Sequence, residues 1–166
     1  MLKNTCSLLL IFLFSSSFVV SSAEEEEEKK DPTLEETVSY IAKKYEKNLD
    51  HTGCYEEASV TVTMVESCHL KITILGCQDA PKRDIILPLE KLDPSKVEVV
   101  GDDERSSIKL TTTEDDEKVI AHVQPNNSWK APSVKLPNIR GYDRTRRLSR
   151  AFRHLISLCG GQEEIF

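Results

Sequence analysis

Six arginines gather in one short stretch near the end of an otherwise acidic chain, and their chemistry is that of anion recognition. They are Arg140, Arg144, Arg146, Arg147, Arg150 and Arg153, with Asp143 as nearly their only acidic neighbour. A guanidinium group is planar and binds carboxylate, sulfate or phosphate through paired hydrogen bonds. The favoured interpretation is a solvated helix face that only balances the acidic segments. The functional alternative is a surface for an acidic protein, a glycan or a lipid headgroup, made by Arg146, Arg147, Arg150 and Arg153.

Cysteine is the second residue type that could do chemistry here. Cys6 precedes an expected cleavage after Ala23, and four of the five cysteines remain: Cys54, Cys68, Cys77 and Cys159. An even number in an exported chain predicts disulfides, although four cysteines allow three pairings. Cys159 follows His154 by five residues on a predicted helix, so the two side chains diverge and a thiol-protease pair is not expected.

No catalytic, cofactor or metal motif accompanies these residues, and we predict no cofactor. The sequence lacks a GxSxG elbow, a phosphate loop, a GxGxxG fingerprint and a calcium loop. A zinc site built from His69, His154 and cysteines is less favoured than ordinary surface or partly buried histidine, because no metal-ligand spacing occurs among His51, His69, His122 and His154. The acidic groups at 102–104 and 115–117 are expected in solvated turns.

The beginning of the chain has the pattern of a secretory signal peptide. Lys3 is followed by an apolar run at 8–20 and by the small residues Ser21 to Ala23, so residues 1–23 are predicted to be cleaved. The apolar run is too short to span a bilayer, and we expect no membrane span in the mature chain. The predicted location is therefore secreted or periplasmic.

Charge and length predict one acidic domain behind a solvated spacer. The net charge is −6, and residues 24–31, EEEEEKKD, contain no apolar residue that could join a core. Nucleic-acid binding is not expected for such a chain. Residues 32–166 suit a single domain. Asn126 begins the sequon Asn126-Asn127-Ser128 and is a glycosylation candidate if the source cell is eukaryotic.

Two amphipathic helices are predicted at the ends of this domain. The first covers 32–48 and begins with a Thr33 to Glu36 capping box. Its apolar stripe is Leu34, Val38, Ile41, Ala42 and Tyr45. The second covers 143–159, with Asp143 as the N-cap and Gly160 in a left-handed conformation at its end. Its stripe is Leu148, Ala151, Phe152, Leu155, Ile156 and Cys159, which marks it as a docking helix.

The chain between the helices predicts short strands. Residues 58–65 and 68–74 alternate apolar and polar residues and form a hairpin, with Val65 opposite Cys68. A run at 83–89 contains Pro88, which predicts an edge strand or a bend. Strands follow at 96–100, 107–112 and 118–124, and the proline-rich residues 125–137 are expected to be a loop. The fold class is therefore α+β, with a mainly antiparallel sheet of five to six strands and the last helix packed on it.

This arrangement predicts one of the three possible ways to pair the four cysteines. In the predicted register Cys77 lies opposite Glu56, so Cys54 is close enough to pair with Cys77. Cys68 shares the inward face of its strand, and Cys159 belongs to the inward stripe of the last helix. We therefore predict Cys54–Cys77 and Cys68–Cys159.

Three stretches carry a resemblance to a known group of proteins. The ending AFRHLISLCGG at 151–161, the helix start TLEET at 33–37 and the segment PLEKLDP at 88–94 resemble uncharacterised small, mostly bacterial proteins. That resemblance implies a pleckstrin-homology-like layout, in which a C-terminal helix caps a sheet, and it implies no activity. The export signal and the number of cysteines depart from that group.

The functional prediction is an exported, non-catalytic binding domain. The alternative is a small secreted hydrolase with an unrecognised active site. Perturbed carboxylates or histidines gathered in one deep pocket would favour the hydrolase, whereas a shallow basic surface would favour the binding domain.

Overall fold

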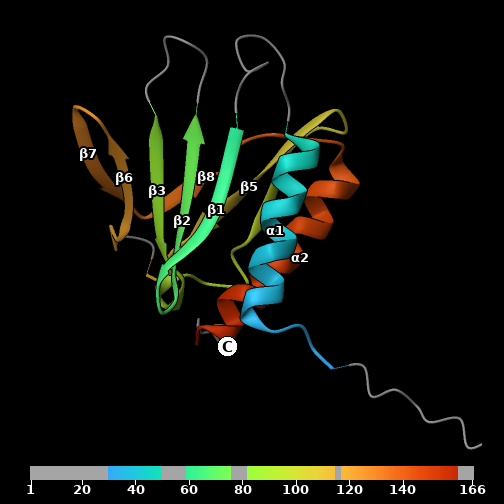
Figure 1. The fold of residues 1–166 in the computed structure, drawn as a ribbon, viewed down its shortest axis with the longest axis horizontal. Helices are drawn as coiled ribbons and strands as arrows, with labels where there is room; N and C mark the ends of the chain where they lie inside the picture. Colours follow the sequence, from blue (N-terminus) through green and yellow to red (C-terminus); the bar gives the residue numbers. More distant parts are fainter. Residues whose placement is uncertain (1–29, 50–58, 76–81, 115–116, 161–166) are drawn as a thin grey trace, which may run out of the picture. The chain divides into compact units, whose positions relative to one another are not determined.

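The computed structural model describes residues 30–49, 59–75, 82–114 and 117–160. In this part of the chain two helices pack beside two antiparallel sheets, which confirms the predicted α+β class (Figure 1). The predicted signal peptide, most of the acidic spacer, Cys54 and Cys77 lie outside the described residues.

Helix α1, Leu34–Asn48, begins as the sequence predicts. The Thr33 side chain accepts a hydrogen bond from the Glu36 backbone N–H, and the Glu36 carboxylate accepts one from the Thr33 N–H at 2.8 Å. This reciprocal capping satisfies two backbone donors that the first helical turn would otherwise leave unpaired. Ile41 and Tyr45 are fully buried in the apolar stripe, which faces β1 and the second helix.

The larger sheet has five strands in the order β1-β2-β3-β6-β7. Their bounds are Ser59–Glu66, His69–Leu75, Arg83–Pro88, Ile120–Gln124 and Asn127–Ala131. Val60 and Val62 face the core while the intervening serine and threonines are exposed, so the alternating pattern gives the strand its two faces. β3 lies inside the sheet, and Pro88 ends it at the start of a short 3₁₀ helix, Leu89–Lys91. Of the two roles predicted for Pro88, the edge strand is wrong, since β3 has a paired strand on each side.

The predicted register of the first hairpin is wrong, by one residue along Ser59–Met64 and by two residues at the turn. Glu66 pairs with His69 at the turn, and the register shifts between Met64 and Glu66, where Val65 is the extra residue of a bulge. Cys68 therefore belongs to the turn and not to a strand, and it has a left-handed backbone with φ of 61°. The bulge changes the residue count on one strand, and simple alternation cannot anticipate it.

The smaller sheet was not predicted as a separate sheet. It contains β4, Glu98–Gly101; β5, Arg105–Thr111; and β8, Ser133–Lys135, with β9, Ile139–Arg140, also paired to β5. The predicted loop at 125–137 is wrong, since β7 and β8 occupy most of it. Four of the five residues of β7 are exposed, so this edge strand has no burial alternation that would reveal it in the sequence.

Helix α2, Tyr142–Leu158, packs on β4, β5 and β9 and along α1. Its predicted apolar stripe is confirmed, with Leu148, Phe152, Leu155 and Ile156 fully buried. The predicted N-cap is wrong: Gly141 occupies that position, and its carbonyl accepts from the Arg144 and Thr145 N–H groups. Asp143 instead lies in the first turn, while Gly160 has the predicted left-handed conformation, with φ of 78°.

Candidate anion-binding groove

An open groove of about 530 Å³ runs between α2 and β4. Three of the four predicted anion-binding arginines line it. The wall formed by α2 consists of Tyr142, Arg146, Ser149, Arg150 and Arg153. The opposite wall consists of Ser95, Val97, Glu98, Val99 and Val100. The volume lies within the range of ordinary ligand sites, about 300 to 1,000 Å³.

The helix brings the three arginines together because of their spacing. Arg146, Arg150 and Arg153 are separated by four and then three residues, so they project from one face of α2. The other face is held against the core by Leu148, Phe152 and Leu155. A buried hydrogen bond of 2.7 Å from Ser106 on β5 to Thr145 also fixes the start of the helix on the smaller sheet. The position of the arginine face therefore follows from the packing of its opposite face.

The arginines differ in how firmly they are held. Arg153 donates from Nη2 to the Val97 carbonyl at 2.8 Å, which ties the helix to the chain just before β4. Arg146 and Arg150 are exposed and form no ion pair with a described carboxylate. Their guanidinium groups are thus available to an anion from outside.

The opposite wall carries one acidic group, Glu98, whose charge is locally balanced. Its carboxylate pairs with Lys109 of β5 at 3.3 Å, and the two residues face each other in the register of the sheet. This exposed pair adds little stability but offsets the negative charge on that wall of the groove. The local field of the groove is consequently positive.

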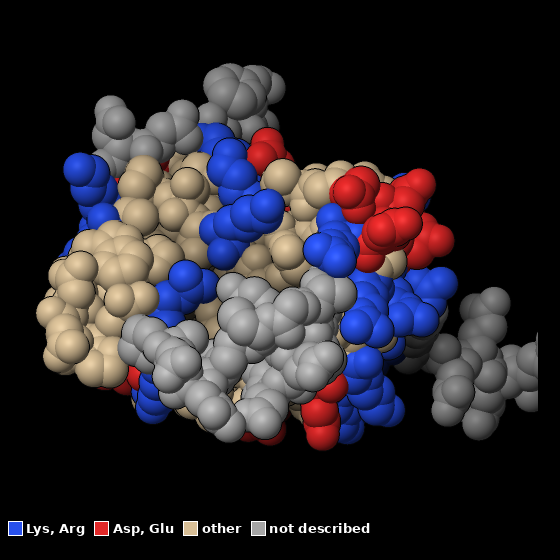
Figure 2. Space-filling view, turned by 90° about the horizontal axis from the view of Figure 1, so that it is seen from above, with Lys and Arg blue, Asp and Glu red and all other residues tan. Residues whose placement is uncertain are grey.

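A second hollow, of about 780 Å³, lies near the start of α2 and shares Tyr142 with the groove. Its charged lining is mixed: Asp103, Glu104, Arg105, Arg140, Asp143 and Arg144. In Figure 2, on the right of the view, basic side chains gather directly beside a compact acidic group. Charges of both signs make this hollow a weaker candidate for anions than the groove.

The remaining predicted site residues lie apart from the groove. Arg147 is exposed on α2 but does not line it. Asn126 is exposed in the turn between β6 and β7, where a glycan would meet no core residue. His154 contacts the Pro32 carbonyl at 2.8 Å, and His122 is buried in the larger sheet.

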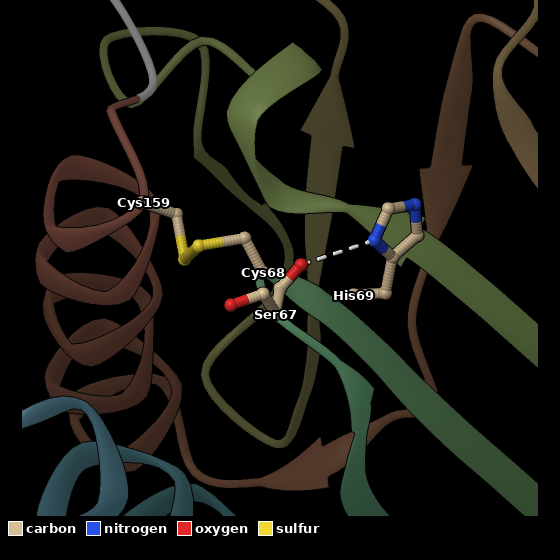
Figure 3. The surroundings of a disulfide bond; sticks show 4 residues. All are labelled: Ser67, Cys68, His69 and Cys159. Atoms are coloured by element: carbon tan, nitrogen blue, oxygen red, sulfur yellow. Dashed lines mark hydrogen bonds between the residues drawn. A yellow bond between two sulfur atoms is a disulfide. The ribbon is translucent and has the colours of Figure 1, made fainter.

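Cys68 and Cys159 form the predicted disulfide (Figure 3). The bond joins the turn between β1 and β2 to the end of α2, with a Cα–Cα distance of 5.5 Å. His69 lies beside this turn and its Nδ1 contacts the Ser67 carbonyl at 3.2 Å. Both cysteines are thereby unavailable as zinc ligands or as a nucleophile. The predicted Cys54–Cys77 bond falls outside the described residues and stays a prediction.

Groups with a shifted pKa occur elsewhere in the described chain. Burial would raise the pKa of Asp84 on β3, but hydrogen bonds from Thr73, at 2.8 Å, and Lys71 lower it below its ordinary value. Backbone N–H groups of Arg105 and Glu104 lower the pKa of Asp102 in the turn after β4. Neither carboxylate lines the groove.

Among the described residues, no group of three or more histidine, cysteine or acidic side chains is placed to hold a metal ion. None of the described helices has the length and apolar character needed to cross a bilayer.

Comparison with protein-family models, characterised proteins and solved structures finds no match to this chain. The resemblance to small pleckstrin-homology-like proteins therefore stays a prediction. Sequence reasoning found the arginine wall of the groove through its helical spacing. It missed the β4 wall, because nothing in residues 97–100 indicates that this strand lies at a sheet edge beside α2.

Proposed function

We propose that this protein is an exported binding domain that takes up anionic groups in the groove between α2 and β4. The observation that carries the proposal is the convergence of Arg146, Arg150 and Arg153 on one groove whose only acidic side chain, among the described residues, is paired with Lys109. Arginine suits this task because its planar fork can hold carboxylate, sulfate or phosphate oxygens through two hydrogen bonds at once.

Export is the second part of the proposal. It is supported by the sequence of residues 1–23 and by the Cys68–Cys159 disulfide, since structural disulfides persist mainly in oxidising compartments. Sequencing the N-terminus of the protein recovered outside the cytoplasm tests this part, and Glu24 is the expected first residue.

Anion binding is tested by replacing the groove arginines together. The variant R146Q/R150Q/R153Q should bind a sulfated heparin oligosaccharide at least tenfold more weakly than the wild type in calorimetric titrations at 50 mM salt. Binding by the wild type should weaken at 200 mM salt, because the Debye length shortens as ionic strength rises.

The matched control removes the same amount of charge elsewhere. Lys118, Lys130 and Lys135 are exposed and lie outside the groove, so K118Q/K130Q/K135Q has the same net charge as the arginine variant. This control should keep most of the wild-type affinity. Equal losses in the two variants, or no binding by the wild type at low salt, would contradict the proposal.

A further inference from the structure

We propose that the natural ligand of the groove is an acidic polypeptide segment that binds in extended form as an additional strand on the free edge of β4. This inference rests on the proposed function and adds the class of ligand and its binding mode. It is carried by the backbone of β4 together with the spacing of the arginines that face it.

β4 is the end strand of the smaller sheet in the described chain. The groove is lined by four consecutive residues, Val97, Glu98, Val99 and Val100. Side chains of consecutive strand residues point to opposite faces of a sheet, so a groove that reaches all four must run along the edge of the strand. A ligand in the groove would therefore meet the backbone of β4.

The hydrogen bonds of β5 show which backbone groups of β4 point into the groove. Val99 pairs with Ile108, but the Ile108 carbonyl accepts from the Leu136 N–H at 2.8 Å, on the side of β8. In an antiparallel ladder this makes Val99 and Ile108 a non-hydrogen-bonded pair. The N–H and carbonyl of Val99 therefore point away from β5, toward the free edge.

Val97, two residues earlier, has the same orientation, and its carbonyl is the one that accepts from Arg153. A group from α2 thus already hydrogen-bonds to this edge. Val99 offers the next donor and acceptor, about 6.6 Å further along the strand. An added antiparallel or parallel strand forms its hydrogen bonds to every second residue of the edge strand, which is the spacing from Val97 to Val99.

The arginine spacing matches an extended chain. Arg146 and Arg150 are one helical turn apart, about 6 Å along the axis. Alternate side chains on one face of a strand repeat every 6.4 to 6.8 Å, roughly the same distance. The span from Arg146 to Arg153, about 10.5 Å, corresponds to about four extended residues. Acidic side chains at positions i and i+2 of a bound strand would each meet one arginine.

The other face of β4 favours neutral residues between the acidic ones. Glu98 points to the face opposite Val99 and pairs there with Lys109. An acidic side chain at an intervening ligand position would lie near the Glu98 carboxylate. The preferred ligand is therefore an acidic residue alternating with a neutral one.

A peptide can pair with the backbone N–H and carbonyl groups at the β4 edge, whereas other anions cannot. A sulfated glycan or a lipid headgroup could pair with the arginines, but neither presents the periodic N–H and carbonyl groups that the β4 edge matches. Addition of a strand to a sheet edge takes affinity from main-chain hydrogen bonds and specificity from alternate side chains.

The experiment measures peptide affinity by fluorescence anisotropy with the full mature chain. The probe is a labelled, end-blocked peptide Glu-Thr-Glu-Thr-Glu, and the composition-matched control is Thr-Glu-Glu-Glu-Thr. The alternating peptide should bind at least threefold more tightly, and R146Q/R150Q should weaken it at least tenfold. R147Q, a change on the same helix outside the groove, should leave the affinity within twofold.

N-methylation of the peptide separates strand addition from simple charge attraction. Methyl groups at the second and fourth amides remove donors on one side of the extended peptide, and a methyl group at the third amide removes one on the other side. One of the two peptides should lose at least tenfold in affinity while the other changes less than threefold. The carboxylates are identical in both, so the asymmetry reports main-chain pairing.

Three other outcomes are possible, and each contradicts a specific part of the two proposals. If both methylated peptides bind alike and still depend on the arginines, strand addition is wrong and anion binding stands. If the heparin oligosaccharide or vesicles containing anionic lipid bind through the arginines while no peptide does, the polypeptide ligand is wrong and the proposed function stands. If none of these probes binds, both are wrong.

Discussion

Tyr45 is the largest of the fully buried side chains, and its hydroxyl is an uncompensated polar group. The hydroxyl has no hydrogen-bond partner in the described structure. Burial also raises the pKa of the phenol far above its ordinary value, so the group is neutral at all physiological pH values. A buried hydroxyl without a partner has lost its hydrogen bonds to water and gained none in return, which destabilises the folded state.

Replacing Tyr45 by Phe should therefore raise the free energy of unfolding by about 1 kcal/mol. The ring and its packing stay, and only the unsatisfied oxygen is removed. Urea denaturation of the purified variant measures the change. Tyr40→Phe is the control on the same helix, where the side chain is exposed and little change is expected. A loss of stability in Tyr45→Phe would show that the hydroxyl has a partner, such as an internal water.

The β6–β7 hairpin is joined by a stacked pair of rings. His122 of β6 lies opposite Trp129 of β7, with ring centroids 4.8 Å apart and planes within 2° of parallel. His122 is buried and its Nδ1 has no hydrogen-bond partner in the described chain, whereas Trp129 is 40% exposed. Burial, and next the nearby Arg83 charge, lower the pKa of His122 below its ordinary 6.5. The hairpin therefore contains a histidine that is held neutral.

This histidine should make stability depend on pH. The unfolded chain takes up the proton near pH 6.5 and the folded chain only at lower pH, so stability falls as the pH drops below 6.5. The slope from one such group is at most about 1.4 kcal/mol per pH unit. Urea unfolding at pH 7.5 and 5.5 should show a smaller difference for His122→Gln than for the wild type. An identical difference in the two proteins would exclude His122 as the source.

The helices were predictable because their signals are local. The capping box at Thr33 and the stripe at Leu148, Phe152 and Leu155 each depend on residues within a few turns of one another. The left-handed Gly160 is a similarly local signal. Packing partners need not be known to read such patterns.

The sheets were less predictable because pairing is not local. β5 pairs with β4, β8 and β9, and no periodicity in its own residues specifies three partners. The Val65 bulge and the left-handed Cys68 changed the hairpin register without changing the pattern of apolar residues. Even so, Cys68–Cys159 was predicted, because it required only that both residues face the core, and the turn position of Cys68 still permits this.

The Cys68–Cys159 bond connects the two sheets through α2. Cys68 lies at the end of the larger sheet, while α2 packs on β4, β5 and β9 of the smaller one. The two cysteines are 91 residues apart in the sequence. The closed loop therefore contains both walls of the groove, and it restricts the unfolded chain strongly.

Replacing both cysteines by serine should lower the free energy of unfolding substantially. The chain-entropy relation gives about 4 to 5 kcal/mol for a loop of this length, and measured losses for native disulfides are about 2 to 5 kcal/mol. Thermal and urea denaturation of C68S/C159S measure the loss, and peptide mapping without reductant tests Cys54–Cys77 in the same protein. Stability equal to that of the wild type would show that this bond does not constrain the unfolded chain.

The same bond determines how the protein responds to mechanical force. Tension applied on both sides of the bridge passes from Cys68 to Cys159 through sulfur, and not through the residues between them. The chain between the two cysteines, about 300 Å long when fully extended, therefore cannot be stretched by the pulling force. α1 and β1 precede the bridge and can be drawn out, whereas β4 and all of α2 are enclosed by it. The groove is consequently shielded from tension until the bridge is reduced.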